Sequence, residues 1–141
     1  MQNIDKRILR FIHKHHVLTL ATSVNQEPYC ANMFYAYLES ENVFVFTSEE
    51  KTRHIHDVLQ NNKIAGSILY ETKIVGLIRG LQFQGTMFEP DKKLLQAAKR
   101  AYLFRFPYAV LSNSPLWVIR PTFLKYTDNR LGFGKKIIVT L

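Results

Sequence analysis

Apolar side chains recur along this chain at two spacings, and the first predicts which segments are helices. Intervals of three and four residues, typical of an amphipathic helix, occur in residues 3–15, 48–62 and 90–106. Asn3 is the expected N-cap of the first helix, Ser48 with two following glutamates begins the second, and Pro90-Asp91 begins the third. We therefore expect three short helices, each with one apolar face.

The remaining apolar segments are rich in β-branched and aromatic residues, which is typical of strands. They cover residues 17–23, 29–38, 43–47, 63–70, 74–88 and 116–126, of which 74–88 is one long strand or a pair. The turns at 25–28 and 40–42 are too short to hold the crossover that parallel strands need. The pattern therefore predicts a mainly β, α+β fold, with an antiparallel sheet of about six strands closed into a small barrel and flanked by short helices.

Three local patterns add detail to the predicted sheet. Residues 29–38 are largely apolar in both alternating sets of side chains, so both faces of that strand should be covered. Gly76, Gly80 and Gly85 lie where a strand bulges or where another group approaches the backbone closely. Near the end of the chain, Gly132-Phe133-Gly134 predicts a flexible turn in a short tail.

Length and composition bound the class of protein. The 141 residues predict one domain, spanning 1–141, with a single hydrophobic core. No apolar run approaches the roughly 20 residues of a membrane helix, and the first residues lack the apolar segment of a secretory signal. The single cysteine, Cys30, fits a reducing compartment, and its place in a strand predicts a buried, inert thiol. We therefore expect a cytoplasmic protein with no membrane partner.

The charge balance predicts an anionic partner. The chain has 19 Lys and Arg residues against 11 Asp and Glu residues, which gives a formal net charge of +8. These cations are dispersed and form no like-charged arm, so we expect no specific nucleic-acid partner. A phosphorylated small molecule is the alternative anion.

The strongest local candidate for an anion site follows the third strand. Thr47 and Ser48 end that strand, and Lys51, Thr52 and Arg53 follow at the start of the expected helix. Hydroxyls, free backbone N–H groups and two cations at one helix start are the chemistry that binds a phosphate monoester. An ordinary capped helix with a solvated first turn explains the same residues, so the local pattern leaves both interpretations open.

Other chemical signatures are weak. The five histidines lack the spacing of a zinc site, and we expect no metal. No Gly-x-Ser-x-Gly and no phosphate-binding Walker loop occurs, and the sequence assigns no catalytic residue. Trp117 and Arg120 lie near the start of the last strand, where they would rim a ligand pocket or, for Trp117, pack in the core.

Taken in order, these segments resemble the FMN-binding split-barrel family of pyridoxamine 5'-phosphate oxidase-like proteins, in particular its small bacterial members. The resemblance spans almost the entire chain. The motifs that carry it are Leu18-Thr19-Leu20-Ala21-Thr22-Ser23, Gln26-Glu27-Pro28-Tyr29, Val43-Phe44-Val45-Phe46-Thr47-Ser48, Lys51-Thr52-Arg53, Asn61-Asn62-Lys63-Ile64-Ala65, Arg79-Gly80-Leu81-Gln82-Phe83-Gln84-Gly85-Thr86 and Trp117-Val118-Ile119-Arg120-Pro121.

The resemblance implies an antiparallel split β-barrel with FMN at the interface of a homodimer. It places the FMN phosphate on the 47–53 loop and the isoalloxazine ring along the second strand. The residues implied for the cofactor site are Met33, Phe34, Tyr35, Thr47, Ser48, Lys51, Thr52, Arg53, Trp117 and Arg120. The oxidases have an arginine on the second strand where this chain has Ala31-Asn32, and they have a longer C-terminal segment for the substrate.

Two classes of function follow from the resemblance. One is a flavin-dependent oxidoreductase that acts on a small organic substrate, with FMN supplying the redox chemistry. The alternative is a non-catalytic module that stores or senses flavin, or a haem-binding relative in which His54 or His56 reaches the iron.

Overall fold

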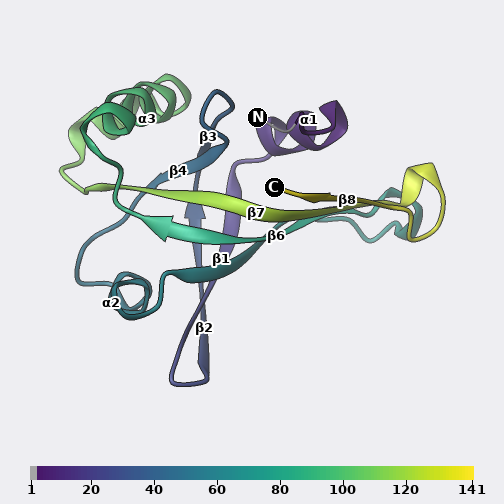
Figure 1. Ribbon diagram of the computed structural model, residues 1–141. Coiled ribbons are helices and arrows are strands. Elements are labelled where there is room, and N and C mark those ends of the chain that lie inside the picture. The colour runs from purple at the N-terminus through teal and green to yellow at the C-terminus, as the bar shows by residue number, and fades with distance from the viewer. Residues whose placement is uncertain (1–2) are drawn as a thin grey trace.

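One eight-stranded antiparallel sheet, curled on itself, dominates the computed structural model, which describes residues 3–141 (Figure 1). Along the sheet the strands follow the order β2-β1-β5-β6-β7-β4-β3, and β8 pairs with the second half of β7. The bounds are β1 (Val17–Val24), β2 (Glu27–Phe34), β3 (Ala36–Leu38), β4 (Val43–Thr47), β5 (Lys63–Tyr70), β6 (Arg79–Phe88), β7 (Leu116–Asp128) and β8 (Lys136–Thr140). The predicted α+β fold with an antiparallel split barrel is confirmed.

Three helices flank the sheet, as predicted: α1 (Lys6–Lys14), α2 (Arg53–Gln60) and α3 (Lys92–Arg105). The N-cap of α1 is Asp5, whose carboxylate accepts from the N–H of Arg7 at 2.8 Å, so the prediction of Asn3 was wrong. The predicted start of α2 at Ser48 was also wrong, because the Ser48 N–H donates to the carbonyl of Pro115 at 3.2 Å. That bond continues the β4–β7 pairing and delays the helix to Thr52, its N-cap.

Aromatic rings fill the inside of the barrel. Phe44 and Phe83 stack with their ring centroids 4.7 Å apart, and both are buried. Ile8 and Ile12 of α1 and Ile55 of α2 pack into the same core. Burial of a side chain of this size contributes about 1.5–3 kcal/mol, so this cluster is what holds the helices on the sheet.

The predicted strand 29–38 is two strands, because the chain bends at Tyr35. The Tyr35 N–H donates to the carbonyl of His16 at 3.0 Å, and its fully buried side chain donates from Oη to the carbonyl of Ile12 at 2.6 Å. Arg105, at the end of α3, donates to the carbonyls of Tyr35 and of His13 and His15 at the end of α1. The bend is therefore fixed from both helices, and it sends β2 and β3 to opposite edges of the sheet.

As an edge strand, β2 is uncovered in the single chain. Its side chains alternate between exposed and half-buried, and none is buried. The prediction that both faces are covered is therefore not met within one chain. Cys30 is exposed on this strand, so the predicted buried thiol was wrong as well.

The end of the chain is a strand rather than a flexible tail. After the short 3-10 turn η3 (Asn129–Leu131), Gly132 and Gly134 adopt positive φ angles of 137° and 68° and turn the chain back. The strand β8 then pairs antiparallel with β7. Ile137 and Val139 of β8 are half-buried against the core, a strand pattern that the glycine-rich turn before it had obscured in the sequence.

The predicted close approach at Gly85 is confirmed. The β6–β7 register shifts between Gln84 and Gly85, and Gly85 pairs with Pro121. Proline has no backbone N–H to donate to a neighbouring strand, so within a sheet it is found at a bulge such as this one. A Cβ on Gly85 would overlap the backbone carbonyl of Arg120 and lie 2.9 Å from Pro121 Cα.

Candidate functional site

The loop between β4 and α2 gathers three polar side chains at its start and end. Ser48 Oγ lies 2.7 Å from His54 Nε2 and 3.3 Å from Thr52 Oγ1. Thr52 donates its hydroxyl to the carbonyl of Glu49 at 2.9 Å and makes no side-chain cap of the helix. The first N–H groups of α2 are therefore left for another acceptor, as at any uncapped helix start.

Two cations stand at the same loop. Lys51 is exposed, and the guanidinium of Arg53 lies 4.5 Å above the ring of Tyr29 on β2. Arg53 Nε is 3.8 Å from Asp57 Oδ2, and this carboxylate also accepts from Thr22 Oγ1 of β1 at 2.8 Å. The ionic contact within α2 and the bond to β1 fix the start of α2 against β1 and β2.

Burial lowers the pKa of His54, and the nearby Asp57 carboxylate opposes that shift. His54 is therefore neutral at neutral pH, and its Nε2 is engaged by Ser48. The cations of the loop are Lys51 and Arg53, and the exposed carboxylates of Glu49 and Glu50 balance their formal charge. Such an arrangement can bind a dianion through hydroxyls, backbone N–H groups and two cations.

The uncovered strand β2 runs away from this loop. Tyr29 and Met33 share one of its faces, because side chains alternate along a strand, and four residues span about 13 Å. Arg53 lies over Tyr29 at one end of this face, and Met33 lies at the other end. A planar ligand on the face would extend from Arg53 to Met33. Phe34 lies on the opposite face, 54% exposed and 5.7 Å edge-on to Phe106. Tyr35 is fully buried, and its backbone N–H and carbonyl are both bonded within the chain, so it offers no free group to a ligand.

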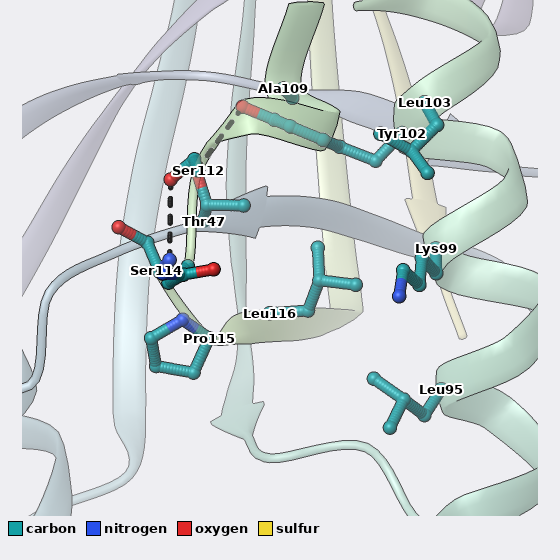
Figure 2. A pocket seen from close by; sticks show the side chains of 11 residues that line it. Thr47, Leu95, Lys99, Tyr102, Leu103, Ala109, Ser112, Ser114, Pro115 and Leu116 are labelled. Atoms are coloured by element: carbon teal, nitrogen blue, oxygen red, sulfur yellow. Dashed lines mark hydrogen bonds between the residues drawn. The ribbon is translucent and has the colours of Figure 1, made fainter. Parts of the chain in front are cut away.

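A polar cavity of about 330 Å³ adjoins the loop at Thr47 (Figure 2). Thr47 Oγ1 lies 3.4 Å from the hydroxyl of Tyr102, and Lys99 lines the wall formed by α3. Across from α3, the backbone N–H of Ser114 donates to Ser112 Oγ at 3.2 Å. The cavity was not predicted from the sequence, because no local pattern joins α3 to the loop at 112–115.

The side chains of Trp117 and Arg120 line other cavities than the loop, although Trp117 pairs with Phe46 directly before it. Trp117 is 2% exposed and lines a cavity of about 550 Å³ at the end of α2, and its indole N–H has no hydrogen-bond partner among residues 3–141. Arg120 lies 5.2 Å over the ring of Phe88 and lines a third cavity, against the first turns of α3. Of the ten predicted site residues, those between 47 and 53 are thus together, and these two are apart.

Across residues 3–141, no group of three or more His, Cys, Asp or Glu side chains is arranged to hold a metal ion. No helix in that same part of the chain is long and apolar enough to cross a membrane.

The curled antiparallel sheet defines the fold as a split barrel, and solved structures share this fold. The model is similar to a heme binding protein from Mycobacterium smegmatis, with a TM-score of 0.78 and 17% identity, covering 99% of this chain and 60% of that one. It is also similar to a FAD-binding protein from Mesorhizobium loti (TM-score 0.69, 13% identity, 86% and 92% of the two chains). A candidate pyridoxamine 5'-phosphate oxidase from Listeria innocua gives a TM-score of 0.69 at 15% identity, over 85% and 94% of the two chains. These likenesses show the fold.

The sequence relatives give the family. The chain is 43% identical over 130 residues to a UPF0306 protein of Enterobacter sp. (strain 638), covering 92% of both chains. It is 40% identical over 131 residues to the UPF0306 protein YhbP of Escherichia coli O157:H7, covering 93% of this chain and 89% of that one. The protein therefore belongs to the UPF0306 family. No family model matches the chain.

Proposed function

We propose that this protein binds FMN at the interface of a homodimer and uses it as an oxidoreductase on a small organic substrate in the cytoplasm. The observation that carries the proposal is the 47–53 loop, which presents hydroxyls, an uncapped helix start and two cations at one end of an uncovered strand. The FAD-binding and pyridoxamine oxidase-like structures of the same fold support a flavin as the ligand.

The residues present fit the phosphate of FMN. Ser48 supplies a hydroxyl 3.3 Å from that of Thr52, whose own hydrogen is held by the carbonyl of Glu49, and the free N–H groups of α2 point out of the helix start. Lys51 and Arg53 supply charge for a dianion. The contact of Arg53 with Tyr29 turns the phosphate end of the site toward β2, where the flavin ring would lie against Met33.

The uncovered surface supports the homodimer. On β2 and the adjacent end of β1, Phe34 and Val17 are large apolar side chains exposed to solvent. Phe104, Tyr108 and Leu111, at and beyond the end of α3, are more exposed still. A second copy on this surface would cover both faces of β2, and we expect a total interface above about 2,000 Å², as in obligate dimers.

When bound, the flavin would supply hydride or electron transfer. The residues of this chain bind and orient the ligand: the loop holds its anionic end, and the edge of β2 offers free backbone groups beside its ring. His54 would stay neutral beside Ser48, so the charge at the site would not change near neutral pH.

A haem-binding function is the other candidate, since one similar structure is a heme binding protein. It is less well supported by the contacts, because His54 Nε2 is engaged by Ser48 and His56 lies on the exposed side of α2.

Mass spectrometry of the small molecule released from the purified full-length protein tests the proposal. We expect FMN, at one molecule per chain, and a dimer in light scattering at micromolar concentration. Release of haem, or a monomeric protein with bound FMN, would contradict the shared flavin site. Turnover with reduced nicotinamide then separates an oxidoreductase from a storage module.

A further inference from the structure

A second cationic cavity lies between α1 and the end of the sheet at which β6 begins and β7 ends. This end is far from α2 and α3, so the cavity and the 47–53 loop are at opposite ends of the sheet (Figure 1). The cavity has a volume of about 310 Å³. The residues that line it are Arg7, Arg10, Phe11, Lys14, Arg79, Tyr126, Asp128, Arg130 and Leu131.

Two of its five cations are neutralised within the chain. Arg7 pairs with Asp5 and Arg130 pairs with Asp128, each at 2.8 Å. Asp128 also accepts from the hydroxyl of Tyr126 at 3.1 Å, which fills its remaining capacity. The pairs leave the other three cations of the cavity without a carboxylate partner among residues 3–141.

Those three cations are Arg10, Lys14 and Arg79, and Arg79 is the exceptional one. Arg79 is only 8% exposed, yet its one side-chain hydrogen bond in the described chain runs from Nε to the carbonyl of Leu77 at 3.4 Å. Its guanidinium stacks 4.3 Å over the ring of Tyr70. Its terminal nitrogens are not among the buried unpartnered atoms of residues 3–141, so they open into the cavity and are free to donate to an anion there.

The surroundings show the same positive field. The pKa of His15 is lowered, first by burial and then by the charges of Lys14 and Arg79. Arg10 and Lys14 lie four residues apart on α1, so they share one face of that helix, and both line the cavity together with Arg79.

We propose that this cavity binds a phosphate group of a small phosphorylated molecule, with Arg79 as its buried anchor and Arg10 and Lys14 at its mouth. The planar fork of Arg79 suits two phosphate oxygens, and the two exposed cations suit a multiply charged anion rather than a single carboxylate. The site is separate from the proposed flavin site and does not depend on it.

Calorimetric titration of the full-length protein with inorganic pyrophosphate tests this site. We expect saturable binding that weakens by about tenfold or more in the double variant Arg10→Ala/Lys14→Ala, since both side chains are exposed and their removal should leave the fold intact. The matched control is Lys92→Ala/Lys93→Ala, which removes the same charge from exposed positions at the start of α3, away from the cavity, and should bind like the parent. The variant Lys51→Ala/Arg53→Ala should keep this binding, which separates the cavity from the flavin loop.

Absence of pyrophosphate binding to the parent protein, or equal weakening in Arg10→Ala/Lys14→Ala and its matched control, would overturn the proposal. A conservative Arg79→Lys variant adds a second readout, because lysine keeps the charge but loses the fork, and we expect weaker pyrophosphate binding at unchanged thermal stability. Co-sedimentation with phosphatidylglycerol vesicles identifies the source of the phosphate. Loss of vesicle binding in Arg10→Ala/Lys14→Ala would indicate a lipid headgroup, and pyrophosphate binding without vesicle binding would indicate a free metabolite.

Discussion

The hydrogen bond from Thr22 to Asp57 anchors α2, and a single substitution measures its strength. Thr22 is 2% exposed, and its Oγ1 lies 2.8 Å from Asp57 Oδ2. Thr22→Val keeps the shape of the side chain and removes the donor, which leaves a buried carboxylate with only the distant Arg53 Nε at 3.8 Å. Because hydrogen bonds to charged groups contribute about 1.5–3 kcal/mol and a buried acceptor without a donor is costly, we expect a loss of about 2–3 kcal/mol.

The same strand offers a matched control. Thr19 Oγ1 donates to Asn32 Oδ1 at the same distance, 2.8 Å, but this pair is neutral and open to water. Thr19→Val should therefore change the free energy of unfolding by no more than about 0.5 kcal/mol. Urea denaturation of both variants at one protein concentration gives the comparison. Equal losses in the two variants would refute the reasoning that burial and charge make the Thr22 bond strong.

Three further predictions follow from single contacts. Gly85→Ala should lower the free energy of unfolding by about 3 kcal/mol in urea denaturation, since the new methyl group would overlap backbone atoms. A methyl group on Gly76 would meet no atom within 4 Å, so Gly76→Ala should be neutral or slightly stabilising in the same assay. The free energy of unfolding should fall as pH drops below 6.5, because the lowered pKa of His54 means that His54 is protonated at a higher pH in the unfolded chain than in the folded chain. In urea denaturation, the midpoint of His54→Asn should therefore depend less on pH in that range than the midpoint of the parent. Phe34→Asp should shift the protein to a monomer in light scattering, because a charge would replace an exposed apolar side chain on the proposed interface, and a dimer that persists would place the interface elsewhere.

Most strands could be predicted from the sequence because local signals agreed with the fold. β4 and β5 have the predicted bounds, and Asp91 caps α3 where Pro90-Asp91 indicated. In these segments the turn residues directly flank the apolar runs, so residues adjacent in sequence are enough to determine where each helix or strand begins and ends.

The predicted element bounds were wrong where contacts with residues far away in the sequence determine where a helix or strand begins or ends. Ser48 looks like a helix cap, but its N–H is held by Pro115, which lies far along the chain. The bend at Tyr35 likewise depends on Arg105, seventy positions later, as well as on Ile12.

The candidate site shows the same division. The cluster at 47–53 is local in sequence and could be predicted, whereas its contact with Tyr29 and the separation of Arg120 depend on how the sheet curls. The cavity beside Thr47 is formed by α3 and the loop before β7, and no local pattern joins those two segments.

The central claim is that the loop after β4 binds the phosphate of a flavin. Its most direct test is a titration of the parent protein and of Lys51→Ala/Arg53→Ala with FMN and with riboflavin, which lacks the phosphate. The side chain of Arg53 is about half exposed before binding, so we expect each cation to contribute about 1–2 kcal/mol and the FMN dissociation constant to rise roughly 30-fold or more. Riboflavin should bind the two proteins equally. An unchanged FMN dissociation constant would contradict the account and leave the loop as no more than the start of a helix.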